Sequence, residues 1–149
     1  MGKFQKIAVF WLSILCFFPH GLMAQTLYNT QVKVIHAGTG PSHIDPGIRD
    51  LIQEIEPVFK YTDYRLIKKQ QMKLQENQAG TLSLPDNRTL VVTPLSLSSN
   101  RIKYQIRIEK NQASLFQTQV LLQNHSSITI GGPRHEKGVL LINVKGDAE

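Results

Sequence analysis

The chain has 149 residues, with 17 Lys or Arg, 11 Asp or Glu and one cysteine. This length suits a single domain. The excess of basic residues is mild and scattered. It lacks the basic stripe with interleaved aromatic residues that is typical of nucleic-acid binding, so the sequence argues against a nucleic-acid partner.

The first 24 residues have the order of a secretory signal peptide. Lys3 and Lys6 give a basic start, residues 7–18 form an apolar run interrupted only by Ser13, and Ala24 is a small residue at the expected cut. The run is shorter than the roughly 20 residues of an ordinary transmembrane helix. We therefore expect a cleaved signal peptide and no integral membrane span afterwards; the alternative is an uncleaved anchor.

The single cysteine, Cys16, lies within this apolar run. It follows Ile14 and Leu15 rather than small residues, which argues against a lipid-modified cysteine. Cleavage would leave about 125 residues with a net charge of +4 and no cysteine, which excludes a disulfide, a thiol nucleophile and a cysteine metal site. We expect such a chain to be held together by a hydrophobic core alone.

After the signal peptide we expect a flexible leader at residues 25–30, one β-rich domain at residues 31–145 and a polar tail at residues 146–149. The domain begins with a predicted strand at residues 31–36 and a Gly/Pro/Ser-rich loop at residues 37–43.

The predicted helix covers residues 45–59. Apolar residues recur there at helical spacing and form one stripe: Ile48, Leu51, Ile52, Ile55 and Phe59. Asp45 is a typical N-cap residue, and Pro46 suits the first turn because its missing N–H has no helical partner there. Pro57 disfavours helical geometry at Glu56, so we expect the helix to end or kink near it.

The rest of the chain alternates short strands with turns. Strands are predicted at residues 64–74, 81–84, 88–98, 101–109, 114–122, 128–130 and 139–144, with a loop at residues 131–138. Residues 101–109 alternate strictly, which predicts a half-buried antiparallel strand. Residues 139–144 are apolar on both faces and therefore central. Pro94 indicates an edge strand or a bulge, and the lysine-bearing strand at 101–109 is expected to protect a sheet edge.

The predicted fold class is α+β and mostly β. An N-terminal βα unit is followed by an antiparallel meander, which forms a small sandwich or open barrel with the single helix packed on it. The helix would plug one end or cover one face.

Two stretches offer candidate site residues. His36, His43 and Asp45 flank the loop before the helix, and two histidines with a carboxylate are a possible zinc or iron set. The second stretch, with Arg134, His135 and Glu136, could bind an anion or exchange protons, although a hairpin loop often has this composition. The glycines at 38 and 40 lack the third glycine of a dinucleotide fingerprint, and no cofactor is expected.

The order of segments resembles small exported proteins of Gram-negative bacteria. The segments are VKVIHAGTG (32–40), IDPGIRDL (44–51), FKYTDYRL (59–66), LSLPDNRTLVVTPL (82–95) and ITIGGPRHEKGVLLINV (128–144). The stretch TQVLLQNHSSITIGGP (118–133) also resembles a strand of secretins, the outer-membrane channel proteins. The resemblance implies a periplasmic or outer-membrane location and no particular chemistry.

These observations favour a non-enzymatic envelope protein that binds another envelope protein or a surface, with sheet edges free for added strands. The alternatives are a metal-dependent enzyme on His36, His43 and Asp45, or a small-ligand carrier that uses the loop before the helix.

Overall fold

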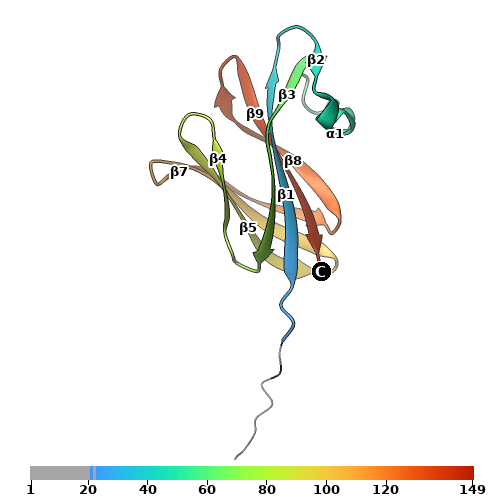
Figure 1. Ribbon diagram of the computed structural model, residues 1–149, viewed down its shortest axis with the longest axis vertical. Coiled ribbons are helices and arrows are strands. Elements are labelled where there is room, and N and C mark those ends of the chain that lie inside the picture. Colours follow the sequence, from blue (N-terminus) through green and yellow to red (C-terminus); the bar gives the residue numbers. More distant parts are fainter. Residues whose placement is uncertain (1–20, 22) are drawn as a thin grey trace, which may run out of the picture.

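The computed structural model describes Gly21 and residues 23–149 (Figure 1). The expected signal peptide therefore lies almost entirely outside the described residues and stays a prediction. The described elements in chain order are β1 (Leu27–Gly38), β2 (His43–Ile44), the 3-10 turn η1 (Pro46–Ile48), α1 (Arg49–Ile55), β3 (Asp63–Gln75), β4 (Gly80–Leu84), β5 (Arg88–Ser98), β6 (Arg101–Lys110), β7 (Ala113–Gln123), β8 (Ser126–His135) and β9 (Gly138–Ala148). Within these elements, no helix is both long and apolar enough to cross a membrane.

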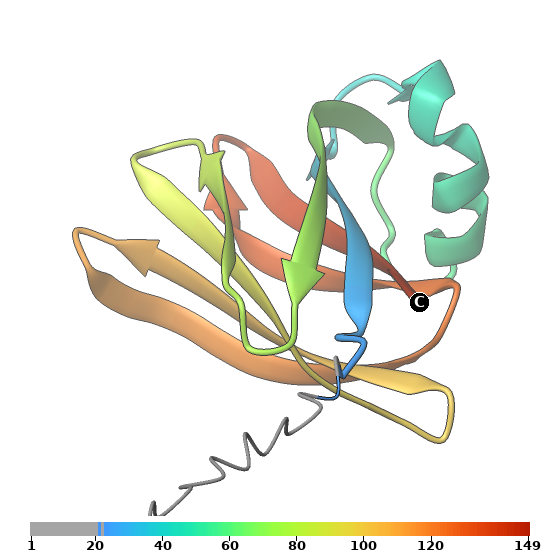
Figure 2. The ribbon, with the colours of Figure 1, turned by 60° about the horizontal axis from the view of Figure 1, so that its bottom comes forward.

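The strands form two sheets. Sheet A has the order β2-β3-β1-β9-β8, and sheet B has the order β4-β5-β6-β7. From β3 to β9 each strand lies beside its predecessor, except where the β3–β4 and β7–β8 connections pass from one sheet to the other. β1 completes the circuit by pairing with both β3 and β9. The fold is thus an up-and-down barrel opened along two seams (Figure 2), which confirms the mostly-β sandwich or open barrel.

The main core fills the space between the sheets. On β6, Ile102, Tyr104, Ile106 and Ile108 are buried between exposed or half-buried neighbours, so the alternation predicted from the sequence is confirmed. The Tyr104 hydroxyl lies 2.7 Å from Thr30 Oγ1 and hydrogen-bonds to it, joining the two sheets inside the core. Burial raises the pKa of the Tyr104 hydroxyl, which therefore stays neutral.

A second, smaller core lies on the outer face of sheet A, where α1 covers the sheet (Figure 2). The helical segment contributes Ile48, Leu51, Ile52 and Ile55, and the sheet contributes Ile35, Ala37, Tyr64 and Leu141. The helix covers one face, as one of the two sequence expectations had it.

The predicted helix at residues 45–59 is too long. Its first turn is the 3-10 turn η1, in which the N–H of Ile48 donates to the carbonyl of Asp45 (3.1 Å), and α1 ends at Ile55. Pro57 has no N–H to donate, and the N–H groups of Val58 and Phe59 both donate to the carbonyl of Ile55. Phe59 still packs on the second core, although it is no longer helical.

β3 contributes side chains to both cores because it contains a bulge. Leu66 pairs with Ile35, Lys68 pairs with Val34, and Ile67 is the extra residue between them. The extra residue reverses the faces. Tyr64 therefore packs under the helix, whereas Met72 packs against the main core, although both have even numbers.

Both ends of the described domain extend further than expected. β1 begins at Leu27, within the predicted leader at residues 25–30, and β9 runs to Ala148, through the predicted tail at residues 146–149. The two ends pair with each other, and backbone hydrogen bonds join Leu27 and Glu149 in both directions (3.2 and 3.0 Å). β9 is central, between β1 and β8, as its apolar composition predicted.

Two further expectations need correction. The predicted loop at residues 131–138 belongs mostly to β8 and β9, which are joined by a tight turn with Glu136 at φ 51°. The strand at residues 101–109 does not protect an edge, because β6 lies inside sheet B. Pro94 lies at a bulge, as expected, in the equally internal β5.

Gly146 packs directly against the core tyrosine. A Cβ at this position would lie 2.7 Å from the Tyr104 hydroxyl and 2.9 Å from Ile102 Cδ1. We therefore expect Gly146→Ala to lower the free energy of unfolding by about 1–3 kcal/mol through overpacking. A Cβ at Gly47 would meet nothing within 4 Å, so Gly47→Ala should be neutral or slightly stabilising. Urea titrations of both variants test this; equal effects would contradict it.

Candidate functional site

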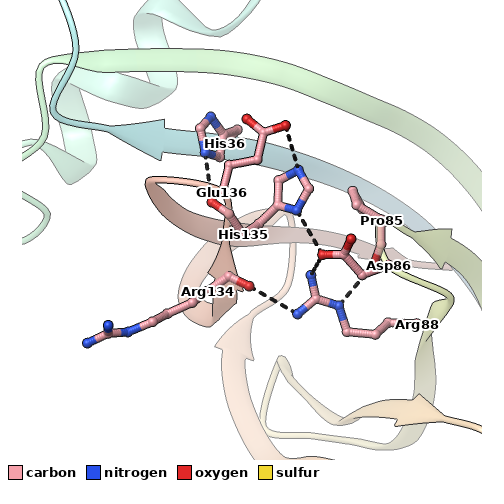
Figure 3. A network of polar contacts seen from close by, with 7 residues as sticks. All are labelled: His36, Pro85, Asp86, Arg88, Arg134, His135 and Glu136. Atoms are coloured by element: carbon pink, nitrogen blue, oxygen red, sulfur yellow. Dashed lines mark hydrogen bonds and ion pairs between the residues drawn. The ribbon is translucent and has the colours of Figure 1, made fainter.

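The structure separates the six predicted site residues into two groups. His43 and Asp45 form a pair at the start of the helical segment. His36, Arg134, His135 and Glu136 lie together at the end of the β8–β9 hairpin (Figure 3). No group of three or more His, Cys, Asp or Glu side chains among the described residues is placed to hold a metal ion. The proposed set of His36, His43 and Asp45 is therefore not assembled.

Asp45 links three elements rather than capping the helix. One carboxylate oxygen lies 2.8 Å from His43 Nε2, and the other accepts the backbone N–H of Leu66 at 2.7 Å. Asp45 stands at the N-cap of η1, with Pro46 in the first turn as predicted, but its side chain makes no capping hydrogen bond. Both carboxylate oxygens of Asp45 therefore have partners, His43 of β2 and Leu66 of β3. These hydrogen bonds, first that of His43 and then that of Leu66, lower the pKa of Asp45.

The lowered pKa of Asp45 predicts a pH-dependent contribution to stability. A carboxyl whose pKa is lower in the folded state stabilises the protein above its unfolded value of about 3.9, and this stabilisation is lost as pH falls through the folded value. Asp45→Ala should cost about 1–2 kcal/mol at pH 7 and less below about pH 4. Denaturant titrations at both pH values measure this. Glu54→Ala, on the exposed helix face, is the control, and a pH-independent cost at position 45 would refute the prediction.

The second group is part of a polar network that joins the two sheets, which we call the Arg88 cluster (His36, Asp86, Arg88, His135 and Glu136; Figure 3). Buried Arg88 donates to the carbonyl of Pro85 (3.0 Å), to the carbonyl of Arg134 (3.1 Å) and to Asp86 Oδ2 (3.1 Å). His135 Nδ1 lies 3.0 Å from the same carboxylate. The cluster thus ties the β4–β5 turn of sheet B to the end of the β8–β9 hairpin in sheet A.

The two histidines of the Arg88 cluster contact each other. His36 Nε2 hydrogen-bonds to the carbonyl of His135 (3.1 Å), and the two rings pack edge to face with centroids 5.5 Å apart. The hydrogen bond from His135, followed by the charges of His135 and Arg88, lowers the pKa of Asp86.

A histidine oriented by a carboxylate is one half of an acid–base catalytic arrangement. In the Arg88 cluster the second ring nitrogen of His135 faces the Glu136 carboxylate at 3.7 Å, so both ring nitrogens face carboxylates rather than a hydroxyl nucleophile among the described residues. The exposed guanidinium of Arg134 lies apart from the buried guanidinium of Arg88. Only the backbone carbonyl of Arg134 joins the network. What the contacts support is a link between the two sheets.

Removing Arg88 should therefore destabilise the fold. Arg88→Ala removes the Arg88 donor from two carbonyls and leaves the Asp86 carboxylate with His135 alone, and we expect a loss of about 2–4 kcal/mol in the free energy of unfolding. Arg134→Ala keeps its carbonyl in place and should change stability by less than about 0.5 kcal/mol. Thermal and urea unfolding of the two variants separate these outcomes. A mild effect at Arg88 would show that the cluster is not structurally important.

The structure reveals a third candidate that the sequence analysis did not single out: the outer edge of sheet B. β7 pairs with β6 on one side only. Three of its apolar side chains are well exposed, namely Leu115 (57%), Phe116 (38%) and Leu121 (53%). Within β7, Leu122 is the one buried residue.

The seam between β7 and β8 leaves part of the main core half covered. Val120 on β7 and Ile128 and Ile130 on β8 pack against the core but are only partly buried. One sequence signal marks this region: residues 111–133 contain no Asp, Glu, Lys or Arg. That signal becomes meaningful only when the topology shows that β7 and β8 are edge strands.

No protein-family model, curated protein or solved structure matches this chain. The functional argument therefore rests on the geometry described above.

Proposed function

We propose that this chain is an exported, non-enzymatic envelope protein that binds an extended segment of another envelope protein along β7. The segment would add a strand to sheet B, so that backbone hydrogen bonds provide affinity and alternate side chains provide specificity. The single observation that carries this proposal is the free, charge-free and partly apolar edge of β7.

The other sheet edges have the protection that β7 lacks. Edge strands are usually blunted by short length, charged residues or a covering element. β4 has only five residues. β3 carries Arg65, Lys68, Lys69 and Lys73, and β2 covers its first residues. β8, the other edge of sheet A, contains Pro133, which has no N–H to pair, and the charged Arg134. β7, by contrast, has 11 residues and no charge.

An added strand would also complete the core. It would extend sheet B toward β8 and cover the exposed Phe116 and the half-buried Val120. Burial of apolar surface contributes roughly 25 cal/mol per Å², so a strand with apolar residues at alternate positions fits best. We therefore expect the partner segment to have apolar residues at alternate positions.

Export is proposed on the N-terminal sequence, with its basic start, apolar run and small residue at position 24. The location would be periplasmic or associated with the outer membrane. The similarity of residues 118–133 to a secretin strand makes an outer-membrane channel the first partner to examine, and that stretch includes the second half of β7.

Site-specific photo-crosslinking in the native cells tests this proposal. A photoreactive residue at Gln119, on the β7 edge, should give a reproducible adduct in the envelope fraction. The matched control is Gln105, which is the cross-strand neighbour of Gln119 but lies on the internal strand β6. Crosslinking from Gln105 should be at least several-fold weaker.

A second pair of variants tests whether the edge itself is responsible. Thr118→Lys places a charge at the half-buried seam and should reduce the Gln119 adduct about tenfold without unfolding the protein. Thr81→Lys places the same charge on β4, the opposite edge of sheet B, and should leave the adduct unchanged. The proposal fails if no adduct forms, if Thr118→Lys leaves it intact, or if its mass equals two copies of this chain.

A further inference from the structure

A different surface of the molecule carries an unbalanced charge pattern. The outer face of sheet A is apolar under α1 but polar toward the opposite end of its strands. There β3, β1 and β9 display what we call the lysine face: Lys33, Lys69, Lys73 and Lys145 together with Asn29, Gln31 and Gln71. Their neighbours on each strand point into the main core, as the burial of Tyr28, Val32 and Val144 shows.

Strand register places these side chains in rows. Lys33 lies directly opposite Lys69, and Gln31 lies between Gln71 and Lys145. Asn29 lies between Lys73 and Asp147. Adjacent strands are about 4.8 Å apart and alternate residues about 7 Å apart, so the lysines are spaced at about 5–14 Å.

The charges of the lysine face are not neutralised within the described part of the protein. No ion pair found there involves any of the four lysines. The nearest acid in the register, Asp147, hydrogen-bonds to His125 at 2.9 Å. Like charges directly opposite each other on a sheet are destabilising, so the Lys33–Lys69 pair weakens the fold unless an external anion lies across it.

A hollow of about 310 Å³ opens on this same surface. It is lined by Asn29, Thr30, Gln31, Gln71, Met72, Lys73, Lys145 and Asp147. Its volume is at the lower end of the range for small-molecule sites. The side-chain amides add donors and acceptors for hydroxyl groups beside the two lysine charges.

The composition of the lysine face discriminates between classes of anionic ligand. It has no aromatic side chain on which a nucleic-acid base would stack. Leu27, at the end of the β1 row, is 40% exposed, but the lysine face has no Trp or Phe to enter a lipid layer, as a membrane-bound surface would. Lysines interspersed with amides match a chain of hydroxyl-rich units that each bear a negative group.

We infer that the lysine face binds an acidic polysaccharide, with one sugar unit in the hollow and its neighbours along the Lys33–Lys69 row. This inference is independent of the β7 proposal, because the two use different sheets.

Calorimetric titration of the purified chain with polygalacturonate, with neutral dextran as the control ligand, tests the inference. Lys33→Gln/Lys145→Gln should weaken polygalacturonate binding at least tenfold. Lys103→Gln/Lys110→Gln removes the same charge from sheet B and should weaken it less than twofold. Thr118→Lys should bind polygalacturonate as the unaltered chain does.

Lys69→Gln should weaken binding while leaving the denaturation midpoint unchanged or higher, because it relieves the repulsion with Lys33.

Three results would overturn the inference. An equal loss of polygalacturonate affinity in both double variants would show that only the net charge of the protein matters. Equal binding of neutral dextran would remove the role of the lysines. Tighter binding to phosphatidylglycerol vesicles or to single-stranded DNA than to polygalacturonate would assign the face to another class of ligand.

Discussion

Two-sided burial of the central strands β1 and β9 is the constraint on which the rest of the structure depends. Toward the helix end of sheet A, β9 buries Leu140 and Ile142 in the main core and Leu141 under α1. β1 does the same with Val34 and Ile35. Because both faces are apolar, sheet B must cover one and the helix the other. The helix lies on the sheet because it buries the apolar side chains of Ile35, Ala37 and Leu141.

The two proposed functional surfaces lie where the strands are no longer buried on both sides. Away from the helix, the outward side chains of the same strands become polar, and the lysine face begins. On the opposite sheet, β7 has a neighbour on one side only, since β8 belongs to sheet A. The protein therefore presents one charged surface with a hollow and one uncharged strand edge. The two differ so much in chemistry that one partner need not compete with the other.

Much of the architecture could be predicted from local pattern, because local pattern reports burial. Strict alternation identified β6, and apolar residues on both faces identified β9 as central. Long-range contacts were invisible. Asp45 was a good capping residue by type, but Leu66 and His43 engage its carboxylate. His135 looked like a loop residue, because nothing in the local sequence reveals Asp86, 49 positions away. The bulge at Ile67 likewise could not be predicted, and it is the reason that Tyr64 and Met72 pack in different cores.

The pairing of β1 with β9 has a consequence for when the protein can fold. Tyr28 pairs with Leu74 of β3 and with Ala148 of β9, so β1 has partners on both sides only after β9 has been made. Contacts between residues so far apart in sequence form slowly, because the loop must close before the contact stabilises it. A chain emerging from the ribosome can pair β1 with β3, but it cannot complete sheet A until β9 is made.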